Sequence, residues 1–302
     1  MDLPISLKDI ESAEALLAAG ELEQAATSLG QMRDDVELYI DSECETKKDV
    51  QYFSFENTFE LLAYRRIEND PRKLIQVGAP FDRMYADLAF VYIQKRDYER
   101  ARDLLMQAVR WNPMNCRYRL DLAELFRALG DKQEWAALSN SVVERASDAK
   151  STARAYTNLG LFFLEDDSLN AEAASACARL AAGFDASDER VSRLFERLAT
   201  EHTEVDDESD DHVMGALSLE SIRTAPSPDI AVCLVMCATD AAKAGDTTSA
   251  TNLTLRARDL FGEGAVEALT KLIRENDADI AAVGAADGTA GEPSDGDDDA
   301  AR

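Results

Sequence analysis

The sequence predicts an all-α protein built as a stacked array of antiparallel helix pairs. Glycine and proline are sparse, at 14 and 7 of 302 residues, while alanine and leucine are abundant, which favours helix. A pattern of small and large residues at helical spacing, closed by a turn or a proline, also recurs along the chain. One such helix pair cannot bury its own apolar stripe, so several pairs must stack.

The pattern is clearest at residues 82–115. With Asp82 as position 1, the small residues Ala89 and Ala101 occupy positions 8 and 20, where two helices can approach closely. Asp97 is placed to cap the second helix, and Asn112-Pro113 should end it, because proline disfavours helix in the residue before it. The larger residues that fill the space beside the helix contact are Tyr85, Leu88, Tyr92 and Leu105.

These positions resemble the tetratricopeptide repeat, a helix–turn–helix unit of 34 residues. The resemblance implies a right-handed solenoid of antiparallel helix pairs that acts as a protein–protein interaction scaffold, without catalysis, cofactor or metal. Residues 82–200 are interpreted as the central repeats of this solenoid. Two rival functions stay open: a metal-dependent enzyme and a self-associating architectural protein.

Residues 1–81 are expected to form a helical region with degenerate or truncated repeats. A first unit is expected around Ala13, Leu16, Gly20 and Ala25, and "TFELLAYRRIENDPRKL" is interpreted as a shortened unit. In the aromatic segment 52–59, Phe55, Phe59 and Leu62 are expected to share one helix face that packs between the first unit and the main array. A groove for an apolar partner peptide is the alternative role of this segment.

Two further units follow the clearest one. The second starts at Cys116, but Trp135 stands at position 20, so this helix pair is expected to be splayed or shifted. The third starts near Ala153, and "AYTNLGLFF" places Gly160 at position 8. Its second helix fits after one inserted residue, with Ala173, Cys177 and Leu180 at positions 20, 24 and 27.

The last third of the chain is interrupted by acidic sequence. Residues 201–225 are interpreted as an acidic flexible linker, since 204–211 reads "EVDDESDD". Residues 226–276 are expected to hold a degenerate repeat that starts near Ala231, followed by a closing helix at 265–276. Residues 277–302 are expected to be a disordered acidic tail.

Composition narrows the possible partners. The net charge is −27, from 59 acids and 32 bases, so nucleic acid and anionic membranes are disfavoured as partners and basic ones are tolerated. No segment approaches the roughly 20 apolar residues of a membrane span, and there is no basic leader, so a cytoplasmic protein is expected.

The resemblance also assigns a candidate binding surface, because positions 2, 5, 6, 9, 12 and 13 of each unit line the concave face in this family. Some members hold a peptide carboxylate there with lysines and asparagines, but Ala86 and Phe90 occupy two of those positions here, so that clamp is not reproduced. A partner peptide or helix with an apolar anchor and both charges is expected instead. The candidate residues are Arg83, Asp87, Phe90, Gln94, Arg117, Asp121, Glu124, Arg154, Asn158 and Leu161.

Residues with metal or redox chemistry are few. His202 and His212 flank the acidic stretch and, with Asp206, Asp207 and Asp210, offer at most a weak cation site. Cys233 and Cys237 lie four residues apart in the apolar stretch "IAVCLVMCA", where a packed core role is expected. The odd number of cysteines, five, favours reduced thiols.

Overall fold

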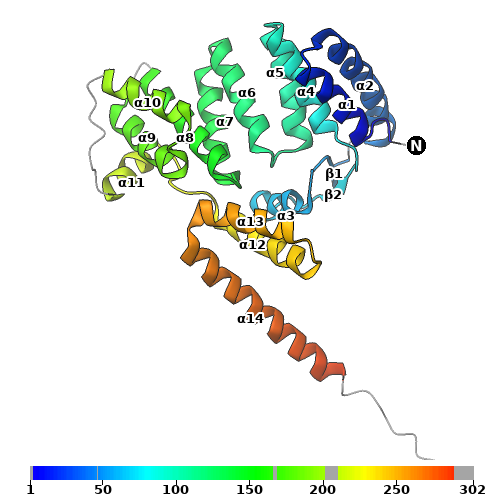
Figure 1. Ribbon diagram of the computed structural model, residues 1–302, viewed down its shortest axis with the longest axis vertical. Helices are drawn as coiled ribbons and strands as arrows, with labels where there is room; N and C mark the ends of the chain where they lie inside the picture. Colours follow the sequence, from blue (N-terminus) through cyan, green and yellow to red (C-terminus); the bar gives the residue numbers. More distant parts are fainter. Residues whose placement is uncertain (1–2, 46, 166–168, 201–209, 289–302) are drawn as a thin grey trace, which may run out of the picture.

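The computed structural model describes the chain except residues 1–2, 46, 166–168, 201–209 and 289–302, and for 210, 212 and 276–288 it describes the backbone alone. The part of the chain that it describes is all-α apart from one small sheet, which confirms the predicted fold class. Fourteen helices and two strands are present in these residues (Figure 1). None of the helices among them is long and apolar enough to cross a membrane.

Four consecutive helix pairs form the array. Each pair packs against the next, so the first helices lie along one face, which we call the inner face, and the second helices lie behind them. The pairs are α1 (Leu7–Ala18) with α2 (Leu22–Glu43), α4 (Phe81–Gln94) with α5 (Tyr98–Trp111), α6 (Cys116–Leu129) with α7 (Lys132–Arg145), and α8 (Ala149–Glu165) with α9 (Ala171–Asp185).

The turns between paired helices repeat one arrangement. Asp97 accepts a hydrogen bond from the Arg100 backbone amide at 3.2 Å and caps α5 as the sequence predicts, and Asp131 caps α7 in the same way. Gly130 ends α6 directly before Asp131. Its φ of 87° is a left-handed conformation that glycine adopts without a steric penalty. α5 ends at Trp111, directly before Asn112-Pro113, so the expected helix end is also confirmed.

The predicted shortened unit in residues 58–74 is not a helix pair. Strand β1 (Val50–Phe53) runs parallel to β2 (Lys73–Gln76), and α3 (Thr58–Glu68) connects them. Because α3 begins at Thr58, Phe55 does not share a helix face with Phe59. We call residues 50–76 the insertion, since they separate the first helix pair from the second.

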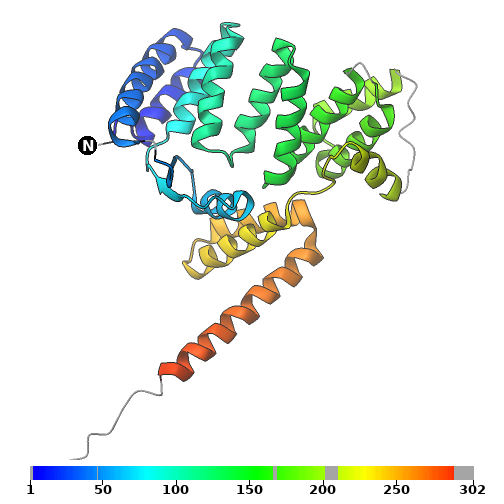
Figure 2. The same cartoon turned by 180° about the vertical axis from the view of Figure 1, so that it is seen from behind.

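The insertion packs against the C-terminal end of the chain. Helices α12 (Pro228–Lys243) and α13 (Thr247–Phe261) form the helix pair expected from near Ala231, but α12 lies on α3 below the array in Figures 1 and 2. The aromatic segment therefore does not fill the space between the first unit and the array. Its rings Phe53, Phe55 and Phe59 share a hydrophobic core with Ile230 and Leu234, which lie on α12.

Polar contacts also join the C-terminal helix pair α12–α13 to the insertion and to the array. Arg66 of α3 forms an ion pair with Asp229 at 3.4 Å. Arg256 of α13 donates to the carbonyl oxygen of Ser147, at 2.9 Å, and so attaches α13 to the segment before α8.

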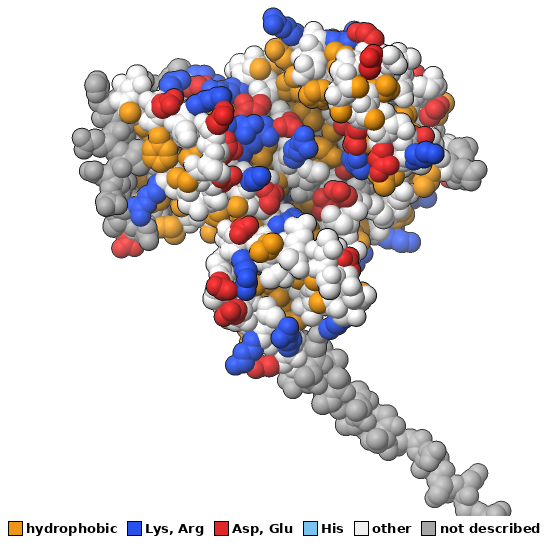
Figure 3. Space-filling view, viewed as in Figure 1, with side chains coloured by type: hydrophobic (Ala, Val, Ile, Leu, Met, Phe, Trp, Pro, Cys, Tyr) orange, Lys and Arg blue, Asp and Glu red, His pale blue; other side chains and the backbone are white. Residues whose placement is uncertain are grey.

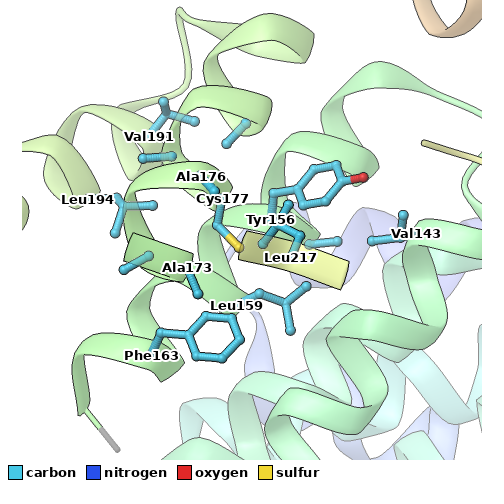
Figure 4. Close-up of a cluster of buried hydrophobic side chains, with 14 of the residues drawn as sticks. Val143, Tyr156, Leu159, Phe163, Ala173, Ala176, Cys177, Val191, Leu194 and Leu217 are labelled. Atoms are coloured by element: carbon cyan, nitrogen blue, oxygen red, sulfur yellow. The ribbon is translucent and has the colours of Figure 1, made fainter. Parts of the chain in front are cut away.

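The α8–α9 pair is extended by two further helices. α10 (Glu189–Thr200) and α11 (Asp210–Leu219) pack beside α8 and α9, and the apolar side of α10 closes the core drawn in Figure 4. In that core Leu194 of α10 points toward the α8–α9 contact (Figure 4). α11 occupies part of the predicted flexible linker, because Val213 and Leu217 give it an apolar side that is buried against α9.

The last helix is longer than the sequence predicts. α14 (Glu263–Gly288) packs against α12 and α13 through Val266 and the residues around it, as expected of a closing helix. It continues past residue 276, where the tail was expected to begin, and the rest of that tail lies outside the described residues.

Candidate functional site

Two grooves lie along the inner face. The first, which we call the Phe90 groove, has a volume of about 560 Å³ and is formed by α1, α4 and α6. Phe90 is 44% exposed although it belongs to α4, whose other large apolar residues are mostly buried. The groove is lined by Glu14, Leu17, Glu56, Arg83, Ala86, Asp87, Phe90, Ile93, Leu105, Asn115, Arg117, Tyr118 and Asp121.

Acidic groups dominate the charge of the Phe90 groove. Arg83 is already paired with Glu14 at 2.6 Å, whereas one carboxylate oxygen of Asp87 is buried without a hydrogen-bond partner among the described residues. Burial, with the nearby charge of Glu14, raises the pKa of Asp87 to about 7. A partner that places a cation beside Asp87 would therefore relieve an unfavourable charge.

The second groove, which we call the arginine groove, has a volume of about 680 Å³ and is formed by α6, α8 and α10. Five arginines and two glutamates line it, and blue side chains gather in this region of Figure 3. The lining residues are Glu124, Arg127, Arg154, Thr157, Asn158, Leu161, Arg190, Arg193, Glu196, Arg197 and Thr200.

One ion pair joins the two grooves. Asp121 lines the Phe90 groove and Arg154 lines the arginine groove, and their side chains form an ion pair at 2.7 Å. Arg117 approaches the same carboxylate at 3.9 Å. The sign of the lining charge therefore changes across Asp121 and Arg154.

The structure brings most of the predicted binding residues to these grooves but does not leave all of them accessible. Asn158 lines the arginine groove but is only 1% exposed, and its amide donates to Ser139 Oγ, at 3.2 Å, between neighbouring helices. The Arg154 side chain is 16% exposed and engages Asp121, so the carboxylate expected from a partner is supplied internally. Gln94 is exposed outside both grooves, whereas the remaining predicted residues line them.

A buried polar cluster links the insertion to the array behind the Phe90 groove. The Asn112 amide donates to a carboxylate oxygen of Glu60 and to one of Asp82, each at 3.0 Å. Ser54 donates to the other oxygen of Asp82 at 2.9 Å. Burial raises the pKa of Glu60 to about 7 and raises that of Asp82 as well, so Asn112 sits between two carboxyl groups that resist ionisation.

The cysteines are free thiols in the structure, four of them buried and Cys237 half-buried. Burial raises the pKa of Cys116 and of Cys233 to about 12, which keeps these thiols protonated at neutral pH. The core position predicted for Cys233 is confirmed. No metal-binding group of histidine, cysteine and acidic residues occurs where side chains are described, and the candidate ligands around residues 202–212 lie outside that part.

Several groove residues were not predicted from the sequence. Arg190, Arg193 and Arg197 come from α10, which follows the third unit and has no place in a two-helix repeat. Their spacing of three and four residues was the available signal, because it places them on one helix face. Glu14 enters the Phe90 groove from α1, and only the packing of α1 on α4 brings it there.

Comparison with known proteins identifies the repeat at residues 82–115. Residues 82–115 match the family model of the tetratricopeptide repeat. A solved chain from "Functional Characterization of Pseudomonas Aeruginosa pilF" is 13% identical with a TM-score of 0.44, over 87% of this chain and 96% of that one. The comparison with curated proteins found no match. Residues 82–115, which form α4, its capped turn and α5, thus correspond to the tetratricopeptide repeat in sequence and in helix–turn–helix structure.

Proposed function

We propose that this protein is a non-catalytic interaction scaffold that binds a partner peptide or helix in the Phe90 groove. The matched repeat at 82–115 supports the general role, since stacked helical repeats offer extended surfaces for protein partners. The exposed Phe90 ring is the observation that supports this groove as the binding site. An aromatic side chain in a groove is a favoured anchor for a partner, because covering it removes a large apolar area from water.

The surroundings of Phe90 define the partner's chemistry. Ile93 and Leu17 extend the apolar floor, while Asp87 and Glu56 provide negative charge that no described basic residue neutralises by a direct ion pair. A partner segment with an apolar side chain next to a lysine or arginine fits this combination.

The test compares two matched alanine variants. Phe90→Ala removes the anchor, and Met106→Ala removes a side chain that is 49% exposed on α5, the other helix of the same pair. Each protein is immobilised and used to capture partners from an extract of the source cells. Proteins retained by the wild type and by Met106→Ala should bind Phe90→Ala about 30-fold more weakly, which corresponds to about 2 kcal/mol.

Two measurements make the outcome decisive. Both variants should keep the helical circular dichroism signal and melting temperature of the wild type, because each side chain is substantially exposed. Equal capture by all three proteins would refute the Phe90 groove as the binding site. If light scattering shows that the wild type self-associates through Phe90, the partner is a second copy of the chain and the architectural function replaces this proposal.

A further inference from the structure

The arginine groove has a local charge opposite to that of the whole protein. Its lining carries five arginines against two glutamates, in a chain whose formal net charge is −27. Basic side chains gathered in one groove of an acidic protein create a local field that attracts negative groups at short range and is screened beyond roughly 10 Å at 0.1 M salt.

The fold of α10 fixes three of these arginines toward the groove. Val191, Leu194 and Leu198 form the buried side of α10 and attach it to α8 and α9. Arg190, Arg193 and Arg197 lie on another face of the same helix and line the groove together. The arginine row is therefore held by core packing that does not involve the guanidinium groups.

The arginines differ in how far the protein already neutralises them. Arg154 is held by Asp121 at 2.7 Å and Arg127 by Glu165 at 2.5 Å, both partly buried. On α10, Arg193 pairs with Glu189 at 3.1 Å, a solvent-exposed pair of the kind that is worth little. Arg197 has no ion pair within the described part of the chain.

We propose that the arginine groove binds an acidic peptide segment, held by Arg193 and Arg197 of α10. The inference rests on the proposed scaffold function and adds to it the chemistry of a second stretch of the partner. Because the grooves adjoin at Asp121 and Arg154, a partner that spans both would carry an apolar, basic stretch followed by an acidic one.

A peptide fits the groove better than a nucleic acid does. Its lining has no aromatic side chain on which a base could stack, and stacking supplies much of the affinity for single strands. A nucleic acid would also extend its phosphates over the acidic remainder of the protein, whereas a short run of glutamates or aspartates ends within the groove.

The test uses fluorescein-labelled hexaglutamate as the probe, with binding followed by fluorescence anisotropy at about 20 mM and about 150 mM salt. The double variant Arg193→Glu/Arg197→Glu reverses the charge of two of the exposed arginines on α10. The control Lys8→Glu/Arg102→Glu makes the same change in net charge at surface positions on α1 and α5, outside both grooves.

We expect the wild type to bind hexaglutamate saturably at low salt. The α10 variant should bind at least tenfold more weakly, a loss of about 1.4 kcal/mol or more, and the control should lie within about twofold of the wild type. Absence of wild-type binding, or an equal loss in the control, would overturn the proposal. So would tighter binding of an oligothymidylate with the same number of charges.

The result is separable from that of the Phe90 groove. Phe90→Ala should leave hexaglutamate binding unchanged, because Phe90 does not line the arginine groove. If partner capture survives Phe90→Ala, the proposed Phe90 site fails while the hexaglutamate measurement still decides the arginine groove.

Discussion

Gly160 provides a direct test of the packing in the α8–α9 pair. It lies in α8, where an added Cβ would meet atoms of both α9 and α10. A methyl group at this residue would stand 2.7 Å from Leu194 Cδ2 on α10, and 3.3 Å from both the Ala174 carbonyl oxygen and Cys177 Cβ on α9. Gly160→Ala therefore places one carbon atom against two helices at once.

The size of the effect follows from two opposing terms. Alanine in place of glycine inside a helix stabilises it by about 1 kcal/mol. Overpacking costs about 1–3 kcal/mol, and the upper part of that range applies because Leu194 is fully buried and the Ala174 oxygen belongs to the backbone. We expect Gly160→Ala to lower the free energy of unfolding by about 1–2 kcal/mol.

Gly183→Ala is the matched control. Gly183 lies in α9, is exposed, and has no neighbouring atom within 4 Å of an added methyl group. This substitution should gain up to about 1 kcal/mol of stability. At about 2–4 °C per kcal/mol, the two variants should differ in melting temperature by roughly 5–10 °C when thermal unfolding is followed by circular dichroism.

A second substitution separates overpacking from other causes. Leu194→Ala removes the atom nearest to the added methyl group and is destabilising by itself. In that background Gly160→Ala should cost less than in the wild type, a coupling that a double-mutant cycle measures. If Gly160→Ala raises the melting temperature as much as Gly183→Ala does, the close approach of α8, α9 and α10 is refuted.

Two further predictions concern the buried polar cluster. Folding raises the pKa of Glu60 from 4.5 to about 7, so between these pH values the folded state keeps a proton that the unfolded state lacks, and the stabilisation is lost as the pH rises. Glu60→Gln should therefore gain stability relative to the wild type as the pH rises from 5 to 8, by about 3 kcal/mol at most, when urea unfolding is measured at both pH values. An unchanged difference would contradict the assignment. The control Glu11→Gln, at an exposed position on α1, should follow the wild type. Asn112→Ala removes the amide donor that Glu60 and Asp82 share, and we expect the free energy of unfolding to fall by about 2–4 kcal/mol in the same assay. A fall of less than about 1 kcal/mol would show that water replaces the amide.

The parts of the fold that sequence predicts are those set by local physics. Asp97, the end of α5 at Trp111, and the small residues Ala89 and Ala101 act within one helix pair. Both alanines are fully buried, as positions of close helix approach require. A capping residue or a proline leaves the same signal wherever the pair stands in the protein.

The parts that sequence reasoning missed depend on distant contacts. Strands β1 and β2 are four residues each, too short to show an alternating pattern. The position of α12 on α3 is set by a core shared between residues far apart in the chain, which no repeat period encodes. Likewise α11 is a helix in an acidic surrounding because α9 buries its apolar side.

In the candidate site, too, sequence predicts what depends on one helix pair and misses what depends on the neighbouring pair. The repeat position of Phe90 predicts an outward direction, and its exposure agrees. Asn158 and Arg154 occupy other predicted inner-face positions, in the third unit, but Ser139 and Asp121 from the preceding pair satisfy them. A position in a repeat gives the direction of a side chain, whereas the neighbouring unit decides whether a partner can reach it.

The core between the insertion and α12–α13 determines when the protein can complete folding during synthesis. The ring pair Phe53–Phe55, stacked at 4.7 Å, is covered by residues that begin only at Pro228. At roughly 5–20 residues per second, the ribosome needs roughly 10–40 seconds to add the intervening chain. The helix pairs of the array can form as they emerge, but this aromatic surface stays uncovered by α12 and α13 for that interval.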